Sequence, residues 1–194
     1  MTAPTDGEAV DLEIYEALQR GDQEAAFRQL VRQYGKVVQT VSYRLLKDRA
    51  RAEDVMQETF MKAYATIDTL QDPKRLGAWL KSIAWHKSID ILRAEKRAGA
   101  HQTTLEQQAA SDDTELAMGA LASLTSDEER RAVRDCLDAL PPDKRAAVVG
   151  RFFAGLEYGE LAAATGEKTD TVRIRVGRAM PELRDCLERK GVKP

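Results

Sequence analysis

The chain has 194 residues, a net charge of -2, 43% hydrophobic residues and 32% charged residues, and this composition excludes a disordered chain. Its length allows one ordinary domain or two small ones with a buried core. The N-terminus has no basic segment followed by an apolar one, and no apolar run approaches the about 20 residues that span a bilayer. We therefore expect a cytoplasmic protein without membrane insertion.

Three long segments of the N-terminal half have the hydrophobic spacing of amphipathic helices. Apolar residues recur three and four positions apart within residues 25–46, 52–67 and 75–97, and those expected to face inward include Phe27, Val38, Val55 and Leu80. Short breaks fall at residues 47–51 and around Asp72 and Pro73, and Asp22 is the expected N-cap of the first segment. No stretch keeps the period of two that a strand requires. These helices are predicted to form one bundle.

The composition changes between residues 99 and 125, where large apolar side chains become rare. Residues 98–130 hold seven acidic side chains against one arginine. We interpret residues 99–125 as a flexible acidic linker. Beyond it, Ser126 and Glu129 have the spacing of a capping box, which predicts the start of a second helical module. Within that module Pro141 and Pro142 begin another helix, and Gly155 separates it from the next.

The stretch "YGELAAATGEKTDTVRIRVGRAM", residues 158–180, has the pattern of a helix-turn-helix. Leu161 is expected to point inward, Gly166 to form the turn and Thr169 to cap the second helix, with Val172 and Val176 facing the first helix. Small alanines allow the two helices to approach closely. A proline at position 181 predicts a kink or a helix end near Met180.

Basic residues gather in two places that the whole-chain charge conceals. Residues 168–193 carry eight basic and four acidic side chains, and residues 74–97 carry seven basic and two acidic ones. Each surface could hold a polyanion. In a helix-turn-helix the start of the second helix enters the major groove, where arginine reaches guanine edges or phosphates. The alternative, from local sequence alone, is a solvated basic face of an ordinary helical hairpin.

An acidic stripe is expected on the helix within residues 52–67, opposite the apolar side that carries Val55, Phe60 and Ala63. The stripe consists of Asp54, Gln57, Glu58 and Met61. It is either a solvated helix face or a docking surface for a basic partner helix. Taken alone, the pattern favours the solvated face.

The cysteines and histidines are too few for a metal site. Cys136 and Cys186 lie fifty positions apart without a Cys-x-x-Cys motif, and the only histidines are His86 and His101. Cysteines of cytosolic proteins usually stay reduced and pack as small apolar side chains. We expect two reduced thiols, no metal and no cofactor; a regulatory disulfide is an alternative that the sequence does not support.

Three ordered motifs together resemble bacterial RNA polymerase sigma factors of the extracytoplasmic-function type. They are "AEDVMQETFMKAY", "AWLKSIAWHKSIDILR" and, after the acidic segment, "CLDALPPDKRAAVVGRFFAGLEYGELAAATGEKTDTVRIRVGRAMPELR". The resemblance extends from about residue 25 to residue 186. It implies an all-α protein with two small helical domains joined by a flexible acidic linker: an N-terminal bundle at 1–98, the linker at 99–125 and a C-terminal helix-turn-helix domain at 126–194.

The resemblance also implies roles for each element. The acidic stripe is similar to the family's binding surface for core RNA polymerase, which grips the beta-prime clamp helices, and the beta subunit is a further contact. The loop from Asp68 to Arg75 and the following helix are similar to the element that melts and reads the minus-ten promoter region, where an extruded base is held in a protein pocket. The implied minus-ten contacts are Lys74, Arg75, Trp79, Lys81, Trp85, His86, Lys87 and Arg93.

The helix from Thr169 is similar to the family's reader of the minus-thirty-five element. The implied contacts are Lys168, Thr169, Asp170, Thr171, Arg173, Ile174, Arg175 and Arg178. The linker resembles the family's connector through the polymerase cleft, and an anti-sigma factor is an implied partner. Trp85 and His86 stand where the family often has an Arg-Asn pair, and Ile174 replaces a small polar residue, so we expect an unusual promoter preference.

Two other functions are alternatives to that of a sigma factor. His86 and Asp90 could share a helix face in an enzyme, but the chain has no second metal ligand in reach and no P-loop, GxSxG or GxGxxG motif, so we expect no catalysis. A two-domain helix-turn-helix regulator that does not join polymerase is the second alternative. In such a regulator, charge reversal of the acidic stripe would have no effect.

Overall fold

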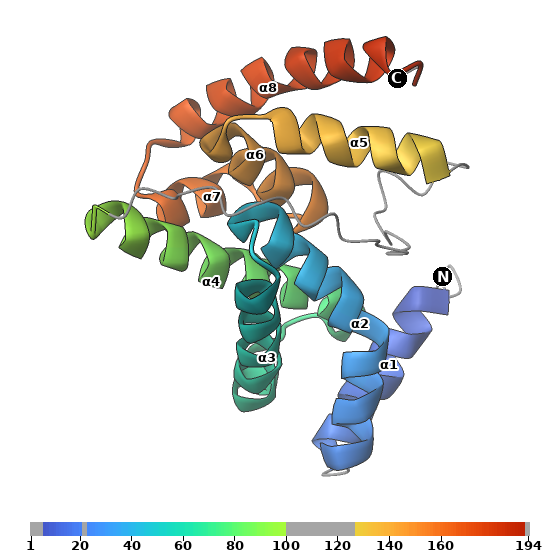
Figure 1. The fold of residues 1–194 in the computed structure, drawn as a ribbon. Coiled ribbons are helices and arrows are strands. Elements are labelled where there is room, and N and C mark those ends of the chain that lie inside the picture. The colour runs from blue at the N-terminus through green and yellow to red at the C-terminus, as the bar shows by residue number, and fades with distance from the viewer. Residues whose placement is uncertain (1–5, 21–22, 100–126, 193–194) are drawn as a thin grey trace.

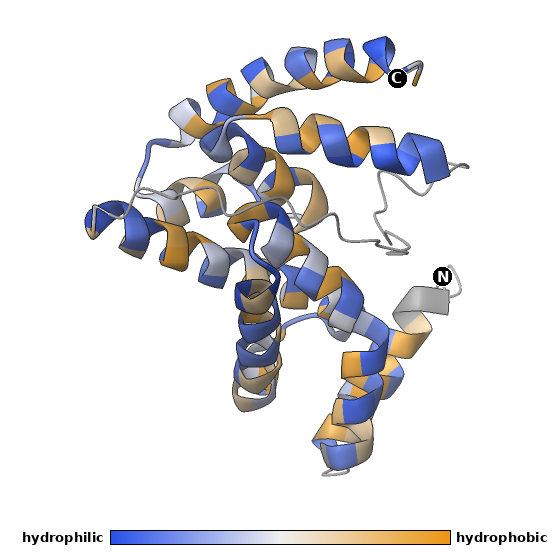
Figure 2. Cartoon of the chain, viewed as in Figure 1, coloured by the Kyte–Doolittle hydropathy of each residue, from blue (hydrophilic) through white to orange (hydrophobic). Residues whose placement is uncertain are grey.

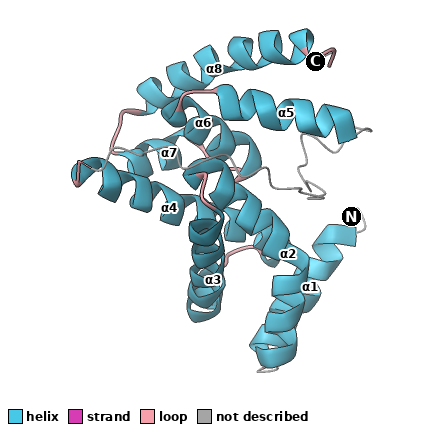
Figure 3. Ribbon diagram, in the orientation of Figure 1, coloured by secondary structure: helices cyan, strands magenta, loops and turns pink. Residues whose placement is uncertain are grey.

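The computed structural model describes residues 6–20, 23–99 and 127–192, and within them every regular element is a helix (Figures 1 and 3). The α-helices are α1 (Asp6–Gln19), α2 (Gln23–Leu46), α3 (Arg49–Thr66), α4 (Leu76–Arg97), α5 (Asp127–Ala139), α6 (Pro142–Val148), α7 (Tyr158–Thr165) and α8 (Thr169–Arg189). Two short 3₁₀ turns, η1 (Ile67–Thr69) and η2 (Pro73–Arg75), precede α4, and a π-helical turn, η3 (Val149–Phe153), follows α6. The prediction of an all-α protein with two helical domains is confirmed. The predicted caps Asp22 and Ser126, and the predicted linker from residue 100 on, lie outside the described residues.

The N-terminal module, residues 6–99, is a bundle in which α2, α3 and α4 pack on one another. Its centre is made of side chains from the three predicted amphipathic segments, including Val38, Val55 and Leu80, each at most 1% exposed. Figure 2 shows that the helices carry both hydrophobic and hydrophilic residues, as half-buried helices must. Phe27, which the spacing assigned to the inward face, is instead 36% exposed.

Helix α1 is an element that the sequence analysis did not predict, and it is anchored by a buried carboxylate. Asp11 is 6% exposed; the Tyr34 hydroxyl donates to it, and so does the backbone N–H of Gly77, at 3.4 Å. The neighbouring residues of α4 provide no side-chain cap for its N-terminus. Asp11 therefore supplies the capping acceptor from another helix. Gly77 has to lack a side chain because a Cβ there would lie 2.7 Å from the Tyr34 ring.

The C-terminal module, residues 127–192, contains the predicted helix-turn-helix in α7 and α8. Gly166 ends α7 at φ 70°, in the left-handed region that favours glycine. Leu161, Val172 and Val176 are buried, as predicted. The predicted cap is displaced by one position, because Lys168 is the N-cap and Thr169 is the first helical residue. The prediction of a helix end near Met180 was wrong, since α8 continues through the proline to Arg189.

The two cysteines are bonded, which corrects the expectation of reduced thiols. Cys136 of α5 and Cys186 of α8 form a disulfide, with Cα atoms 5.7 Å apart. Spacing alone gave no sign of this pairing because the bond requires α5 and α8 to lie side by side, an arrangement set by tertiary packing. The two helices indeed lie together at one end of the molecule (Figure 1).

The two modules pack directly on each other. Helix α2 contacts α6 and η3, and helix α4 contacts α7 and η3. One hydrophobic core spans both modules and includes Trp85 and Ile89 from the first and Ala146, Val149 and Leu161 from the second. We call this shared surface the domain junction; its polar members are Arg44, Lys47, Trp85, Arg93, Asp138 and Arg145.

Candidate polymerase and nucleic-acid interfaces

The acidic stripe of α3 lies on the surface. All four of its residues are exposed, and Met61 is 69% exposed, whereas Val55, Phe60 and Ala63 on the opposite side are buried. This division follows from the helical period, which puts positions three or four apart on one face. One member of the stripe is partly engaged, because Lys87 of α4 donates to the Glu58 carboxylate at 2.6 Å.

An apolar hollow adjoins the stripe in the C-terminal half of α3. It is lined by Phe27 and Glu24 of α2 and by Met61 and Tyr64 of α3. Phe27, Met61 and Tyr64 are among the most exposed large hydrophobic side chains of the described residues. Exposed Met and aromatic side chains beside a charged stripe are typical of protein-binding surfaces, so the hollow extends the candidate interface beyond the four residues that the sequence identified.

The candidate minus-ten residues occupy η2 and α4, but they differ widely in exposure. Lys74 and Arg75 are exposed on η2, just before α4 begins. Asp72 caps this turn, since its carboxylate accepts from the backbone N–H of Lys74 at 3.1 Å. Helix α1 braces the loop from the other side, where the Gln19 side chain donates to Asp68 at 3.0 Å. The loop that the resemblance assigns to promoter reading is thus held in a defined shape.

Four further candidates on α4 are half-buried: Trp79, Lys81, His86 and Lys87. Burial lowers the pKa of Lys81, and the nearby carboxylate of Asp11 opposes that shift. The same burial raises the pKa of Asp11, although its hydrogen bonds with Tyr34 and Gly77 favour the ionised form. His86 is turned toward its own helix, with Nδ1 2.7 Å from the carbonyl oxygen of Ser82.

Trp85 is fully buried, although the resemblance implies that it contacts DNA. Its indole N–H donates to the carbonyl oxygen of Ala146 at 3.0 Å, and its ring packs against η3. Gly150 makes this approach possible, because a Cβ there would lie 2.8 Å from the Trp85 ring and 2.4 Å from Leu161. Arg93 of the same helix donates to the carbonyl oxygen of Ala164 at 2.6 Å. In this arrangement Trp85 is covered by the C-terminal module and cannot touch DNA.

A cluster of charges lies at the edge of the domain junction around Asp138, near the end of α5. Arg44 of α2 donates to both carboxylate oxygens of Asp138 at 3.3 Å, and Lys47 forms a second ion pair with it. Arg145 adds a third cation and donates to the carbonyl oxygens of Asp138 and Leu140. Burial lowers the pKa of both Lys47 and Arg145.

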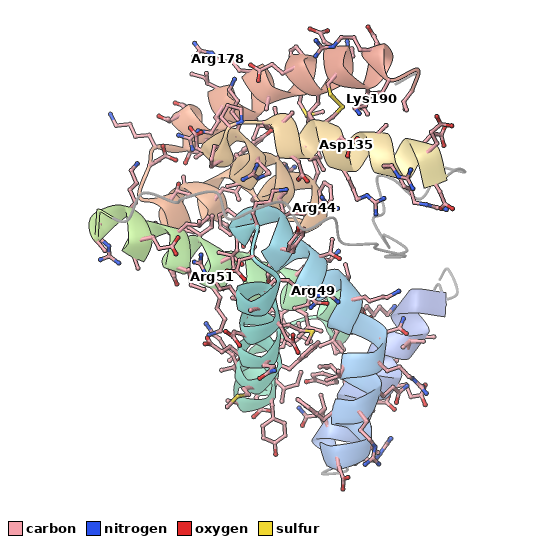
Figure 4. The ribbon with its side chains drawn as sticks, in the orientation of Figure 1. Arg44, Arg49, Arg51, Asp135, Arg178 and Lys190 are labelled. Atoms are coloured by element: carbon pink, nitrogen blue, oxygen red, sulfur yellow. A yellow bond between two sulfur atoms is a disulfide. The ribbon has the colours of Figure 1, made fainter. Side chains whose placement is uncertain are left out.

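The candidate minus-thirty-five residues lie along the first half of α8 and are not equally available. Lys168, Thr169, Asp170, Thr171 and Ile174 are exposed. The guanidinium of Arg173 pairs with Asp170 at 3.0 Å and lies over the Tyr158 ring, but its side chain remains 60% exposed. Arg178 is exposed, and Figure 4 shows it on α8, the helix at the edge of the molecule.

Arg175 is held inside the module. Only 17% of its side chain is exposed; it pairs with Glu167 in the turn and lies 3.4 Å from the Asp143 carboxylate. The hydrogen bond from Arg175 lowers the pKa of Glu167, and Glu167 in turn raises the pKa of Arg175. Glu167 thus fixes the turn through an ion pair where an apolar side chain often packs. Arg175 is better placed to support the turn than to reach DNA.

Other kinds of site find little support in the part of the chain that the structure describes. Its His, Cys, Asp and Glu side chains form no group of three or more that could hold a metal ion. Of its helices, none has the length and apolar character needed to cross a membrane. Among the described residues, no further metal-ligating side chain is grouped with His86 and Asp90, the pair that an enzyme could use.

Two protein-family sequence models match the chain. The model described as Sigma-70 region 2 matches residues 30–98, and the one described as Sigma-70, region 4 matches residues 130–183. The first match begins within α2, so it leaves α1 out. The two matches fall on the two modules, in chain order.

Individual relatives agree with these matches. The chain is 34% identical over 171 residues to the ECF RNA polymerase sigma factor SigE of Mycolicibacterium smegmatis, which covers 86% of this chain but only 64% of SigE. The chain therefore spans somewhat less than two thirds of that relative. It is 30% identical to the RNA polymerase sigma factor CarQ of Myxococcus xanthus over 84% of this chain and 89% of CarQ.

Two of the solved structures with a similar fold are complexes. One is the sigma factor RpoE in complex with the anti-sigma factor NepR from Bartonella quintana, with a TM-score of 0.53 and 24% identity over 84% of this chain and 96% of that chain. The other is CnrH in complex with the cytosolic domain of CnrY, with a TM-score of 0.52 and 24% identity over 92% of this chain and 97% of that chain. These two likenesses concern the fold alone.

Proposed function

We propose that the two modules have separate roles in promoter recognition. The chain belongs to the extracytoplasmic-function group of bacterial RNA polymerase sigma factors. Sigma factors are the promoter-specificity subunits that direct transcription initiation. The observation that carries the proposal is the order of the matches, region 2 on the N-terminal module and region 4 on the C-terminal one. Residues 1–98 join core polymerase and open the minus-ten region, and residues 126–194 bind the minus-thirty-five element. Sigma factors are non-catalytic initiation factors, and we assign this chain no reaction of its own.

The core-binding surface is the acidic stripe of α3 together with the adjoining apolar hollow. Asp54, Gln57 and Glu58 provide polar and acidic groups for a basic partner helix, and Met61 provides exposed apolar area beside them. Charge complementarity guides the encounter and sets the register, while the buried apolar contact slows dissociation. The partner is the pair of clamp helices of the beta-prime subunit.

Promoter contacts are made by exposed basic residues at two sites. Lys74 and Arg75 on η2 approach the opened minus-ten strand, and the basic face of α4 follows its backbone. Arg173 and Arg178 on α8 approach the minus-thirty-five duplex in the major groove. We assign Arg175 a supporting role in the turn, because it is already engaged by Glu167 and Asp143. Trp85 takes part in promoter reading only after the domain junction has separated.

An anti-sigma factor is a further partner under this proposal. Two similar folds were solved in complex with such an inhibitor or with a second protein's cytosolic domain. Its identity depends on contacts that this chain does not specify. Any such partner that binds at the acidic stripe would compete directly with core polymerase.

The test is run-off transcription with purified protein and bacterial core RNA polymerase on fragmented genomic DNA from the source organism, with sequencing of transcript 5′ ends. New start sites with two spaced upstream elements are expected. Asp54→Arg combined with Glu58→Arg should abolish both these transcripts and core binding, since repulsion replaces attraction. Glu13→Arg on α1, an exposed acidic residue outside the stripe, is the matched control and should leave both unchanged.

Circular dichroism must show that all variants fold. If the folded wild-type protein, free of inhibitor, neither binds core polymerase nor yields transcripts, the sigma-factor mechanism is wrong for this chain. A protein that binds duplex DNA with unaltered affinity after charge reversal of the stripe would then be a regulator that acts without polymerase.

A further inference from the structure

The disulfide joins the first helix of the C-terminal module to its last. Cys136 on α5 is 1% exposed among Val133, Leu137 and Leu183, while Cys186 on α8 is half-buried. Figure 4 shows the bond between the two helices, close to Asp135 and Lys190. Lys190 donates to the Asp135 carboxylate at 2.8 Å, so an ion pair accompanies the covalent link.

These are the only two cysteines of the chain, and a stable disulfide is unexpected beside RNA polymerase. This step rests on the proposed function: a sigma factor works in a compartment where thiols are kept reduced, and the disulfides found there are usually transient or redox-sensing. Neither cysteine has an alternative partner within the chain. The pair therefore has only two states available within the chain, one disulfide or two thiols.

Helix α5 connects this pair to the domain junction. Asp138 lies two residues beyond Cys136, and its carboxylate is bound by Arg44 and Lys47 of the N-terminal module. Arg44 is 4% exposed, whereas Asp138 keeps 35% of its side chain exposed at the edge of the junction. Helix α5 is thus tied to α8 by the disulfide and to α2 by Asp138, so both attachments lie on the same helix, two residues apart.

We propose that Cys136 and Cys186 form a reversible redox site that controls how firmly the two modules pack together. In the disulfide form, α5 is fixed on α8 and presents Asp138 to Arg44 and Lys47, which keeps the junction closed. In the dithiol form, α5 gains freedom relative to α8, the Asp138 ion pairs weaken, and the face of α4 that carries Trp85 becomes accessible.

The chemistry is thiol–disulfide exchange with a low-molecular-weight disulfide. The Cys186 thiolate, the more accessible of the two, attacks one sulfur of that disulfide, forms a mixed disulfide and releases one small thiolate. The Cys136 thiolate then attacks the Cys186 sulfur and releases the second small thiolate. Two protein thiols lose their protons and are oxidised, and one small disulfide is reduced to two thiols. A small dithiol reverses both steps.

Thiol titration and mass spectrometry of the full chain, equilibrated with mixtures of reduced and oxidised glutathione, test the redox site itself. The expected result is a two-electron transition between two free thiols and none. A bond that resists dithiothreitol in the folded protein, or thiols that oxidised glutathione does not join, would overturn the proposal. These measurements need no polymerase, so they separate a failure here from a failure of the proposed function.

The packing of the two modules at the domain junction is measured by small-angle scattering and by acrylamide quenching of Trp85 fluorescence in a Trp79→Phe background. Reduction, or the pair Cys136→Ala and Cys186→Ala, should enlarge the radius of gyration and raise the quenching constant severalfold. Reduction should also lower the thermal midpoint by at least about 10 °C.

Two substitutions one turn apart on α5 complete the test. Asp138→Asn should open the oxidised protein, since it removes the attachment to α2, whereas Asp135→Asn, which affects only the Lys190 pair, should leave it closed. If the oxidised and reduced wild-type proteins have equal radii of gyration and equal quenching constants, the cysteine pair does not control the packing of the two modules. This holds even if the cysteines titrate reversibly.

Discussion

Replacing Gly150 with alanine gives a sharp test of the domain junction, because two physical effects of this change have opposite signs. Gly150 lies in η3, and alanine stabilises a helical position by about 1 kcal/mol relative to glycine. However, the new Cβ would lie 2.4 Å from a Leu161 methyl carbon and 2.8 Å from two atoms of the Trp85 ring. Neither separation is compatible with normal van der Waals contact.

The steric effect should outweigh the helical gain. The Trp85 ring cannot simply move away, because its N–H is held by the carbonyl oxygen of Ala146 and its surroundings are fully buried. Overpacking a core costs about 1–3 kcal/mol, and distortion of this hydrogen bond adds about 1 kcal/mol. After subtraction of the helical gain, Gly150→Ala should lower the free energy of unfolding by about 1–3 kcal/mol.

Gly177→Ala is the matched control. Gly177 is an exposed glycine of α8, and an added Cβ there meets no atom within 4 Å. The free energy of unfolding of this variant should therefore rise by about 1 kcal/mol. Urea denaturation followed by tryptophan fluorescence should shift the two midpoints in opposite directions, and Trp85 in the Gly150 variant should become more accessible to acrylamide. If both variants gain stability with unchanged quenching, the reasoning about the junction is refuted.

Three further predictions concern single side chains. Asp11→Ala leaves the Gly77 N–H unpaired and should lower the free energy of unfolding, measured by urea denaturation, by about 1–3 kcal/mol. Asp11→Asn keeps an acceptor and should lower it by less. Equal losses in the two variants would contradict capping by Asp11. The folded-state pKa of Glu167 is lowered, so its ionised carboxylate stabilises the folded protein at pH values above the unfolded-state pKa. This stabilisation is lost as the pH falls through the folded-state pKa. The difference in free energy of unfolding between wild type and Glu167→Gln should therefore narrow between pH 6 and about pH 3. Arg178→Ala should weaken binding to the minus-thirty-five duplex, measured by fluorescence anisotropy. The slope of the logarithm of the binding constant against the logarithm of the salt concentration should fall by about one phosphate contact. An unchanged slope would show that Arg178 does not contact a phosphate.

The sequence predicted those features that depend on neighbours within a few turns. The spacing of apolar residues in α2, α3 and α4 correctly identified buried side chains such as Val38, Val55 and Leu80, because a half-buried helix has to repeat its apolar positions every three or four residues. Gly166 was recognised as the turn of the helix-turn-helix for a similarly local reason, its tolerance of positive φ.

Features that depend on distant partners could not be predicted in this way. Asp11 is buried because Tyr34 and Gly77, 23 and 66 positions away, satisfy its carboxylate. In the sequence it is an ordinary acidic residue near the N-terminus, and α1 around it was missed. Spacing places Trp85 on a face of α4 but does not reveal what covers that face, which depends on a carbonyl group 61 positions further along the chain.

The composition of the domain junction suggests that it is built to separate. Its apolar part packs Trp85 and Ile89 against Ala146, Val149 and Leu161, and its edge gathers Arg44, Lys47 and Arg145 around the single carboxylate of Asp138. Among the described residues, Arg44 and Arg145 each bury a side-chain Nε without a hydrogen-bond partner. Buried cations stabilise an interface less than apolar side chains of the same size would, because desolvation offsets much of the attraction. Separation returns these charges to water, which offsets part of the cost of exposing the apolar side chains, and the proposed role of α4 in promoter reading requires such separation.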